Sequence, residues 1–169
     1  ATLFFGISAT AQTHNVTFRV DLGSGTANAN GVHIAGSFQG WDPSSTSLSQ
    51  VGTSSIYETT LAVSQGKLEY KFINGNVWGD DESVPAEVSV GTNSNGNRWA
   101  VISQDTVLPA VLFAGSAPAG MKAIQFKVDM SLQSLSTDSI HIVGSFQGLN
   151  PSKTMMVNFD GVHRYIAYF

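Results

Sequence analysis

The stretch Gly31-Val-His-Ile-Ala-Gly-Ser-Phe-Gln-Gly-Trp-Asp-Pro43 joins a short strand to a tight turn. Val32 and Ile34 alternate with their neighbours at the two-residue period of a half-buried strand. Gly40 then lets the backbone bend, and the Asp-Pro pair closes the turn. Trp41 therefore stands in a turn, where a large apolar ring either folds back onto the core or stays out to stack on a ligand.

A second copy of this stretch begins 108 residues later, as Ser139-Ile-His-Ile-Val-Gly-Ser-Phe-Gln-Gly-Leu-Asn-Pro151. Around it, residues 16–61 align with residues 124–169 without a gap. A repeat this long indicates a duplicated domain and not a solenoid of short repeats. The second copy lacks counterparts of residues 67–113, so we expect it to leave its apolar face uncovered.

The composition is typical of many short strands joined by turns. Charged residues make up 12% of the chain, and it contains 17 glycines. Besides the opening stretch, strands are expected at residues 16–22, 56–63, 67–74, 98–102 and 107–113, and residues 44–55 are expected to be loop. In residues 67–74, Leu68, Tyr70 and Phe72 are expected to face inward. No segment sustains a 3.6-residue period, so no helix of consequence is predicted. The fold class expected from these patterns is all-β.

Charge and cysteine content exclude several classes of function. The 169 residues allow one domain or two small ones, and the formal net charge is −4. No basic run is present, which argues against nucleic acid as a partner. No apolar run approaches the roughly 18 residues of a membrane span. The absence of cysteine excludes disulfides and thiolate metal sites.

The first residues indicate the compartment. Residues 1–11 are apolar and then small, and Ala9-Thr10-Ala11 has the form of a secretory cleavage site. We interpret residues 1–11 as a signal-peptide remnant, with an ordinary first strand as the alternative, and expect a secreted or cell-surface protein. Residues 12–115 then form one module, residues 116–122 a linker, and residues 123–169 a truncated second copy. Further covalently linked domains are expected beyond residue 169.

Two blocks of the first copy resemble a known family. They are Val32-His-Ile-Ala-Gly-Ser-Phe-Gln-Gly-Trp-Asp-Pro43 and Gly66-Lys-Leu-Glu-Tyr-Lys-Phe-Ile-Asn-Gly-Asn-Val-Trp78, followed by Asp81 and Pro85. Over residues 15–102 this pattern resembles the starch- and glycogen-binding modules of amylases, glucoamylases and the AMP-activated kinase β subunit. The resemblance implies an immunoglobulin-like antiparallel β-sandwich.

The resemblance also implies an α-glucan site of two tryptophans and a lysine. These positions match Trp41, Trp78 and Lys71, and Asn97 is the nearest match to an asparagine that contributes in the kinase-type modules. Independently, an indole offers a rigid apolar plane with a polar edge, which suits the C–H face of a sugar. Two such rings, on loops at one end of a sheet, are expected to clasp consecutive sugars. Lys71 is expected to have its ammonium free for sugar hydroxyls.

The function expected from the sequence is non-catalytic binding of an α-1,4-glucan polysaccharide or oligosaccharide, with no cofactor, metal or catalytic residue. Asp80-Asp81-Glu82 is interpreted as a solvated turn, because adjacent carboxylates do not converge on one ligand. Trp99 is expected in the core, and Leu149, in place of Trp41, removes the site from the second copy. The alternatives are a protein–protein interaction β-sandwich of a secreted multidomain protein, and an accessory part of a glycoside hydrolase.

Overall fold

The computed structural model describes residues 12–91, 96–133, 140–159 and 161–169. The first copy contains β1 (Thr13–Asp21), β2 (Val32–Gly36), β3 (Ser47–Gln50), β4 (Ile56–Ser64), β5 (Gly66–Ile73), β6 (Arg98–Ile102), β7 (Thr106–Val107) and β8 (Val111–Leu112). The second contains β9 (Ala123–Asp129), the 3-10 turn η1 (Ser145–Gln147), β10 (Val157–Phe159) and β11 (Val162–Tyr168). The all-β prediction is confirmed for these residues.

One prediction falls outside this description. The signal-peptide interpretation concerns residues 1–11, which lie outside the described residues. Within the part of the chain that is described, no helix has the length and apolar character needed to cross a bilayer.

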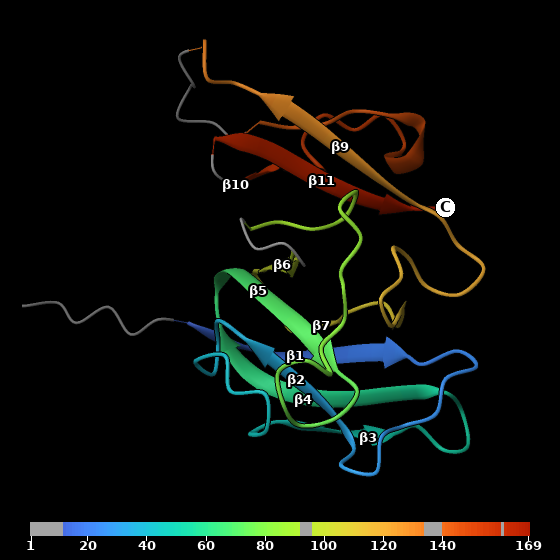
Figure 1. The fold of residues 1–169 in the computed structure, drawn as a ribbon. Coiled ribbons are helices and arrows are strands. Elements are labelled where there is room, and N and C mark those ends of the chain that lie inside the picture. The colour runs from blue at the N-terminus through green and yellow to red at the C-terminus, as the bar shows by residue number, and fades with distance from the viewer. Residues whose placement is uncertain (1–11, 92–95, 134–139, 160) are drawn as a thin grey trace, which may run out of the picture.

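Eight strands form one sheet in the order β6-β5-β2-β3-β4-β1-β7, with β8 also paired to β1. The sheet curls until it is nearly closed into a barrel-like shape (Figure 1). β1 pairs antiparallel with β4, but parallel with both β7 and β8. The expectation of a purely antiparallel sheet is therefore wrong. A parallel pair needs a crossover connection, and the chain from β4 through β6 provides it.

Two local expectations differ from the structure for identifiable reasons. The strand predicted over residues 107–113 is broken into β7 and β8, which flank Pro109. Proline has no N–H to donate to a ladder, so it interrupts a strand. The short β3 was predicted as loop, because its serine-rich sequence has weak strand propensity.

The core of the first copy follows from alternation along β1 and β5. Val16, Phe18 and Val20 of β1 are fully buried, and the Phe18 ring lies 5.1 Å from that of Phe38 and 5.2 Å from that of Tyr70. The neighbouring core residues of β5 are Leu68, Tyr70 and Phe72. The prediction that these three face inward is confirmed.

The turn that carries Trp41 has the same structure in both copies. Gln39 donates through Nε2 to the carbonyl oxygens five residues before and three residues after it, at 3.3 and 2.6 Å. Gln147 makes the same two bonds at 2.7 and 2.9 Å. Trp41 (φ 63°) and Leu149 (φ 57°) share a left-handed backbone that bulky residues rarely adopt. Because leucine adopts it too, this strain belongs to the turn and not to the indole.

The gap-free repeat fails over its last strand. Phe18 pairs with Thr59 in the first copy, and its counterpart Phe126 pairs with Tyr165 in the second. Thr59 and Tyr165 therefore occupy the same place in the two copies, and they are 106 positions apart and not 108. The hairpin between β10 and β11 is two residues shorter than the one between β3 and β4. Because side chains along a strand alternate with a period of two, a deletion of two residues does not change which side of the sheet each residue of β11 faces.

The second copy forms a three-stranded sheet, β10-β11-β9, that packs on the first copy. Phe159 is 6% exposed and its ring lies 5.0 Å from that of Trp99. Trp99 pairs with Glu69 and so faces outward, toward β10, which makes the prediction of a core Trp99 wrong. On the far side of the small sheet, Ile124 is 46% exposed where its counterpart Val16 is fully buried. This is the uncovered face expected of the second copy.

Candidate functional site

The side chains of β5 that do not face the core form a polar row. We call Lys67, Glu69 and Lys71 the outward row, because they alternate with the buried Leu68, Tyr70 and Phe72. Trp41 and Trp78 lie on the loops that border this row. Ser37 N donates to Glu69 O at 2.9 Å, which sets the Trp41 loop beside the first half of β5.

The two tryptophan loops lie at opposite ends of β5. β2 and β5 are antiparallel, so the loop that leaves β2 and the loop that leaves β5 emerge in opposite directions. The expectation that both loops lie at one end of a sheet is therefore wrong. A strand rises about 3.3 Å per residue, so Glu69, near Trp41, is about 13 Å from Ile73, after which the Trp78 loop begins.

Both indoles lie outside the hydrophobic core. Trp78 is 48% exposed, and Trp41 is half-buried and does not belong to the core cluster. Trp41 instead borders a hollow of about 370 Å³. The residues that line it, which we call the Trp41 hollow, are Ser37, Trp41, Lys67, Glu69 and Phe159. The alternative of a tryptophan folded into the core does not hold for either ring.

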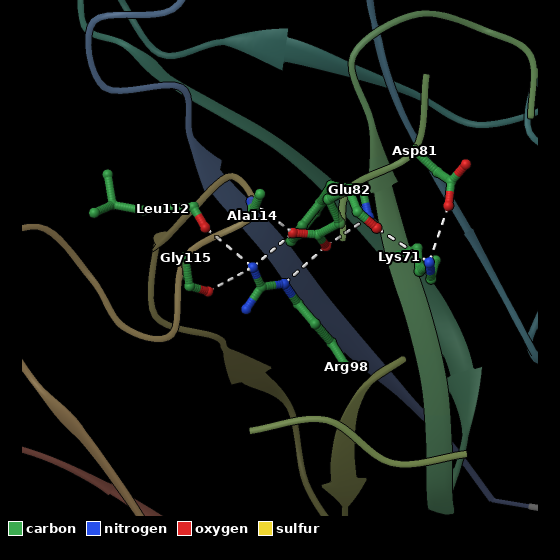
Figure 2. Close-up of polar contacts among 8 residues, drawn as sticks. Lys71, Asp81, Glu82, Arg98, Leu112, Ala114 and Gly115 are labelled. Atoms are coloured by element: carbon green, nitrogen blue, oxygen red, sulfur yellow. Dashed lines mark hydrogen bonds and ion pairs between the residues drawn. The ribbon is translucent and has the colours of Figure 1, made fainter. Parts of the chain in front are cut away.

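Lys71 holds the Trp78 loop in place. Its side chain is only 6% exposed, and Nζ donates to Asp81 Oδ2 at 2.9 Å and to the carbonyl oxygen of Glu82 at 3.1 Å (Figure 2). The other oxygen of Asp81 accepts a hydrogen bond from the backbone N–H of Gly79, next to Trp78, at 3.0 Å. The prediction of a free ammonium is wrong, because two of the three donors of Lys71 are occupied.

The Lys71–Asp81 pair predicts a pH dependence of stability. Burial alone raises the pKa of Asp81, but hydrogen bonds from Lys71 and Gly79 outweigh it and hold the pKa below its ordinary value. A carboxyl with a lowered folded-state pKa stabilises the fold fully above its unfolded pKa, about 3.9, and loses this contribution as pH falls through the folded value. The difference in unfolding free energy between wild type and Asp81→Asn is therefore expected to be constant above roughly pH 4 and to shrink below it.

Urea unfolding followed by circular dichroism between pH 7 and pH 2 measures this difference. Asp105→Asn serves as the control, because the Asp105 side chain is 69% exposed and its ionisable neighbour is His14 and not Lys71. A wild-type-minus-Asp81→Asn difference that stays flat down to pH 2 contradicts the expectation.

Asn97 lies beside Glu69 and not beside a tryptophan. It is 7% exposed, and Nδ2 donates to Glu69 Oε2 at 2.9 Å. Its backbone N–H and carbonyl pair with Val90 at 2.8 and 3.0 Å. Glu69 itself lines the Trp41 hollow, so Asn97 is linked to that hollow through Glu69 and does not line it. Glu69 was not singled out from the sequence, although its place two residues before Lys71 puts it on the same strand face.

A buried ion pair lies at the end of the Trp78 loop, on the core side of the sheet. Glu82 is 1% exposed, and its carboxylate accepts hydrogen bonds from Arg98 Nε at 2.8 Å and Nη2 at 2.6 Å (Figure 2). The backbone N–H groups of Phe72 and Ala114 donate to the same carboxylate, each at 3.0 Å. Burial alone lowers the pKa of Arg98, but the charge and hydrogen bonds of Glu82 raise it above its ordinary value.

The prediction of a solvated turn over Asp80-Asp81-Glu82 is therefore wrong for its last two residues. Asp81 pairs with Ile73 across an antiparallel bridge and so lies on the outward side with Lys71. Its neighbour Glu82 then points to the opposite side, into the core. The sequence does not reveal this arrangement, because three consecutive acidic residues show no alternation of apolar and polar side chains.

The described residues contain no group of three or more metal-binding side chains placed to hold a metal ion. No protein-family model matches the chain, and no curated protein matches it.

Proposed function

We propose that residues 12–115 form an immunoglobulin-like module of a secreted or cell-surface protein that binds α-1,4-glucans such as starch or glycogen without catalysis. The observation that carries this proposal is the placement of two indoles outside the core, one at each end of the outward row. Trp78 is 48% exposed, and Trp41 borders a hollow that polar side chains also line. Exposed indole planes suit the apolar faces of sugar rings.

Polar groups between the two rings supply hydrogen bonds to sugar hydroxyls. Glu69 and Asn97 lie next to the Trp41 hollow, and Lys71 lies between them and the Trp78 loop. A carboxylate accepts up to about four hydrogen bonds, so Glu69 keeps capacity beyond its bond from Asn97. The Lys71 side chain is only 6% exposed, so its main contribution is to hold the Trp78 loop through Asp81. Because the Trp41 loop lies beside Glu69 and the Trp78 loop begins after Ile73, about 13 Å further along β5, we expect the two rings to contact different sugars of one chain.

The loops that carry the indoles are held before a ligand arrives. Gln39 bonds across the Trp41 turn, and Lys71 and Asp81 brace the Trp78 loop. Such preorganisation lowers the entropic cost of binding. The ligand is uncharged and the contact shallow, so we expect an affinity of roughly millimolar to micromolar, about −4 to −8 kcal/mol, with little salt dependence.

Affinity electrophoresis in gels that contain amylopectin tests this function. The variant with both Trp41→Ala and Trp78→Ala is expected to lose its retardation, an affinity loss of at least about tenfold, or about 1.4 kcal/mol. The matched control is Leu149→Ala, at the same turn position of the second copy, which should be retarded like wild type. A double variant that is retarded as strongly as wild type refutes the site.

A second candidate function, docking of a partner protein, is favoured by one observation. The rings of Phe126, Phe146 and Tyr165 lie 5.3 to 6.5 Å apart on the uncovered side of the small sheet, and Phe169 beside them is 52% exposed. Exposed apolar patches are common at protein interfaces. This patch includes neither Trp78 nor Lys71, so binding through it should be unaffected by the double tryptophan variant.

A further inference from the structure

The Trp41 hollow is bordered by residues of both copies. Trp41, Ser37, Lys67 and Glu69 come from the first copy, and Phe159 comes from β10 of the second. Its volume of about 370 Å³ lies in the range of small-ligand sites, roughly 300–1,000 Å³. The lining therefore combines one apolar ring from each copy with the polar side chains of Ser37, Lys67 and Glu69.

Phe159 is fixed in this position by contacts with the first copy. Its ring packs on Trp99 with 5.0 Å between ring centroids, and Lys67 Nζ lies 5.0 Å from the centroid of the Phe159 ring. Lys67 Nζ also donates to the carbonyl oxygen of Asn158 at 2.7 Å. The β10–β11 hairpin is thus attached to the outward row at its first residue. Because these contacts already exist, a ligand need not order the hairpin when it binds.

The chemistry of the hollow matches a sugar ring. A pyranose has apolar C–H faces and a rim of hydroxyls, so it needs apolar contacts on its faces and polar groups at its edge. Trp41, which is half-buried, offers the larger apolar contact, and Phe159, which is 6% exposed, adds to it where its ring lines the hollow. Lys67 uses one of its three donors on Asn158, and Glu69 uses one carboxylate oxygen on Asn97, so both retain capacity for hydroxyls.

We infer that the second copy is a constituent of the glucan site, with Phe159 as the apolar group that faces Trp41 across the bound sugar. This inference rests on the proposed function. It gives the second copy a role although Leu149 has replaced its own turn tryptophan. The ligand class is a linear α-1,4-glucan oligosaccharide, one sugar of which occupies the Trp41 hollow.

Titration calorimetry of the full chain with maltoheptaose tests the inference. Phe159→Ala is expected to weaken binding by at least about fivefold, since truncating an aromatic anchor in a binding site is commonly costly. Phe159→Leu keeps apolar bulk against Trp99 but removes the flat ring, and it should weaken binding by at least about threefold. The matched control is Ile166→Ala, which removes an apolar side chain between the copies that does not line the Trp41 hollow.

The outcomes separate this inference from the proposed function. If Phe159→Ala and Phe159→Leu bind like wild type while Trp41→Ala loses binding, the glucan site stands and the role of Phe159 is wrong. If Ile166→Ala weakens binding as much as Phe159→Ala, the second copy affects binding only by packing on the first copy and not by contacting the sugar. That result also overturns the inference. If wild type does not bind maltoheptaose, the proposed function itself fails.

Discussion

Replacing Arg98 with methionine is expected to lower the free energy of unfolding by about 3–5 kcal/mol, because it leaves the Glu82 carboxylate buried without its partner. Glu82 is 1% exposed, and Arg98 donates two of the four hydrogen bonds that its carboxylate accepts. Arg98 Nη2 also donates to the carbonyl oxygens of Leu112 and Gly115, each at 3.0 Å. The substitution therefore loses contacts to two separate segments at once, Glu82 and the turn from Leu112 to Gly115.

Urea unfolding followed by circular dichroism measures the effect, with Arg19→Met as the matched control. Arg19 pairs with Glu58 at 3.1 Å, but these side chains are 28% and 40% exposed, so its loss should cost at most about 1 kcal/mol. Replacing both partners, as Arg98→Met with Glu82→Leu, should recover part of the loss, since no buried charge then stays unpaired. Equal effects of Arg98→Met and Arg19→Met would contradict the burial of the pair.

The ion pair also bears on the proposed site. Glu82 follows Asp81 directly, so the two carboxylates anchor the end of the Trp78 loop on both sides of the sheet, one to Arg98 and one to Lys71. An Arg98→Met protein that remains folded should therefore bind amylopectin more weakly than wild type.

Truncating Phe18 to alanine is expected to cost about 3–5 kcal/mol, as for other large-to-small changes in cores. Phe18 is fully buried and its ring contacts the rings of Phe38 and Tyr70. The repeat provides a matched control in Phe126→Ala, which removes the same ring from a half-buried position. That change should cost only about 1–2 kcal/mol, in proportion to the smaller apolar area withdrawn from water.

The free energy of unfolding of these two variants is measured by urea titration. The comparison isolates the contribution of the strands that cover Phe18 in the first copy, because the ring and its strand position are the same in both. A Phe126→Ala protein destabilised as much as Phe18→Ala would mean that the second copy buries its aromatic face as deeply as the first.

Much of the fold was predictable because alternation along a strand directly reflects which side is dry. The period of two along β1 and β5 placed Val16, Phe18, Tyr70 and Phe72 in the core. The glycines and the Asp-Pro pair around Trp41 predicted its turn, which the structure contains twice. Short-range chemistry suffices for these features, since each depends on residues within one strand or one turn.

The candidate site was predicted less completely, because its geometry depends on which strands pair. The sequence placed Trp41 and Trp78 on separate loops, but the antiparallel pairing of β2 with β5 sends those loops to opposite ends of the row. It placed Lys71 on the outward face, but not Asp81 beside it. The bridge between Ile73 and Asp81 joins those residues, and strand alternation alone does not reveal a bridge of this kind.

The amino-acid sequence by itself determined most of the strands, the side of each strand that faces the core, and the duplicated turn. Only the tertiary structure decided that Lys71 and Glu82 are paired and buried, that Trp99 meets Phe159, and that the second copy borders the Trp41 hollow. The physical reason is that hydrophobic alternation acts within a strand. Ion pairs and contacts between the copies join residues distant in the chain, and their geometry exists only once the sheets have packed.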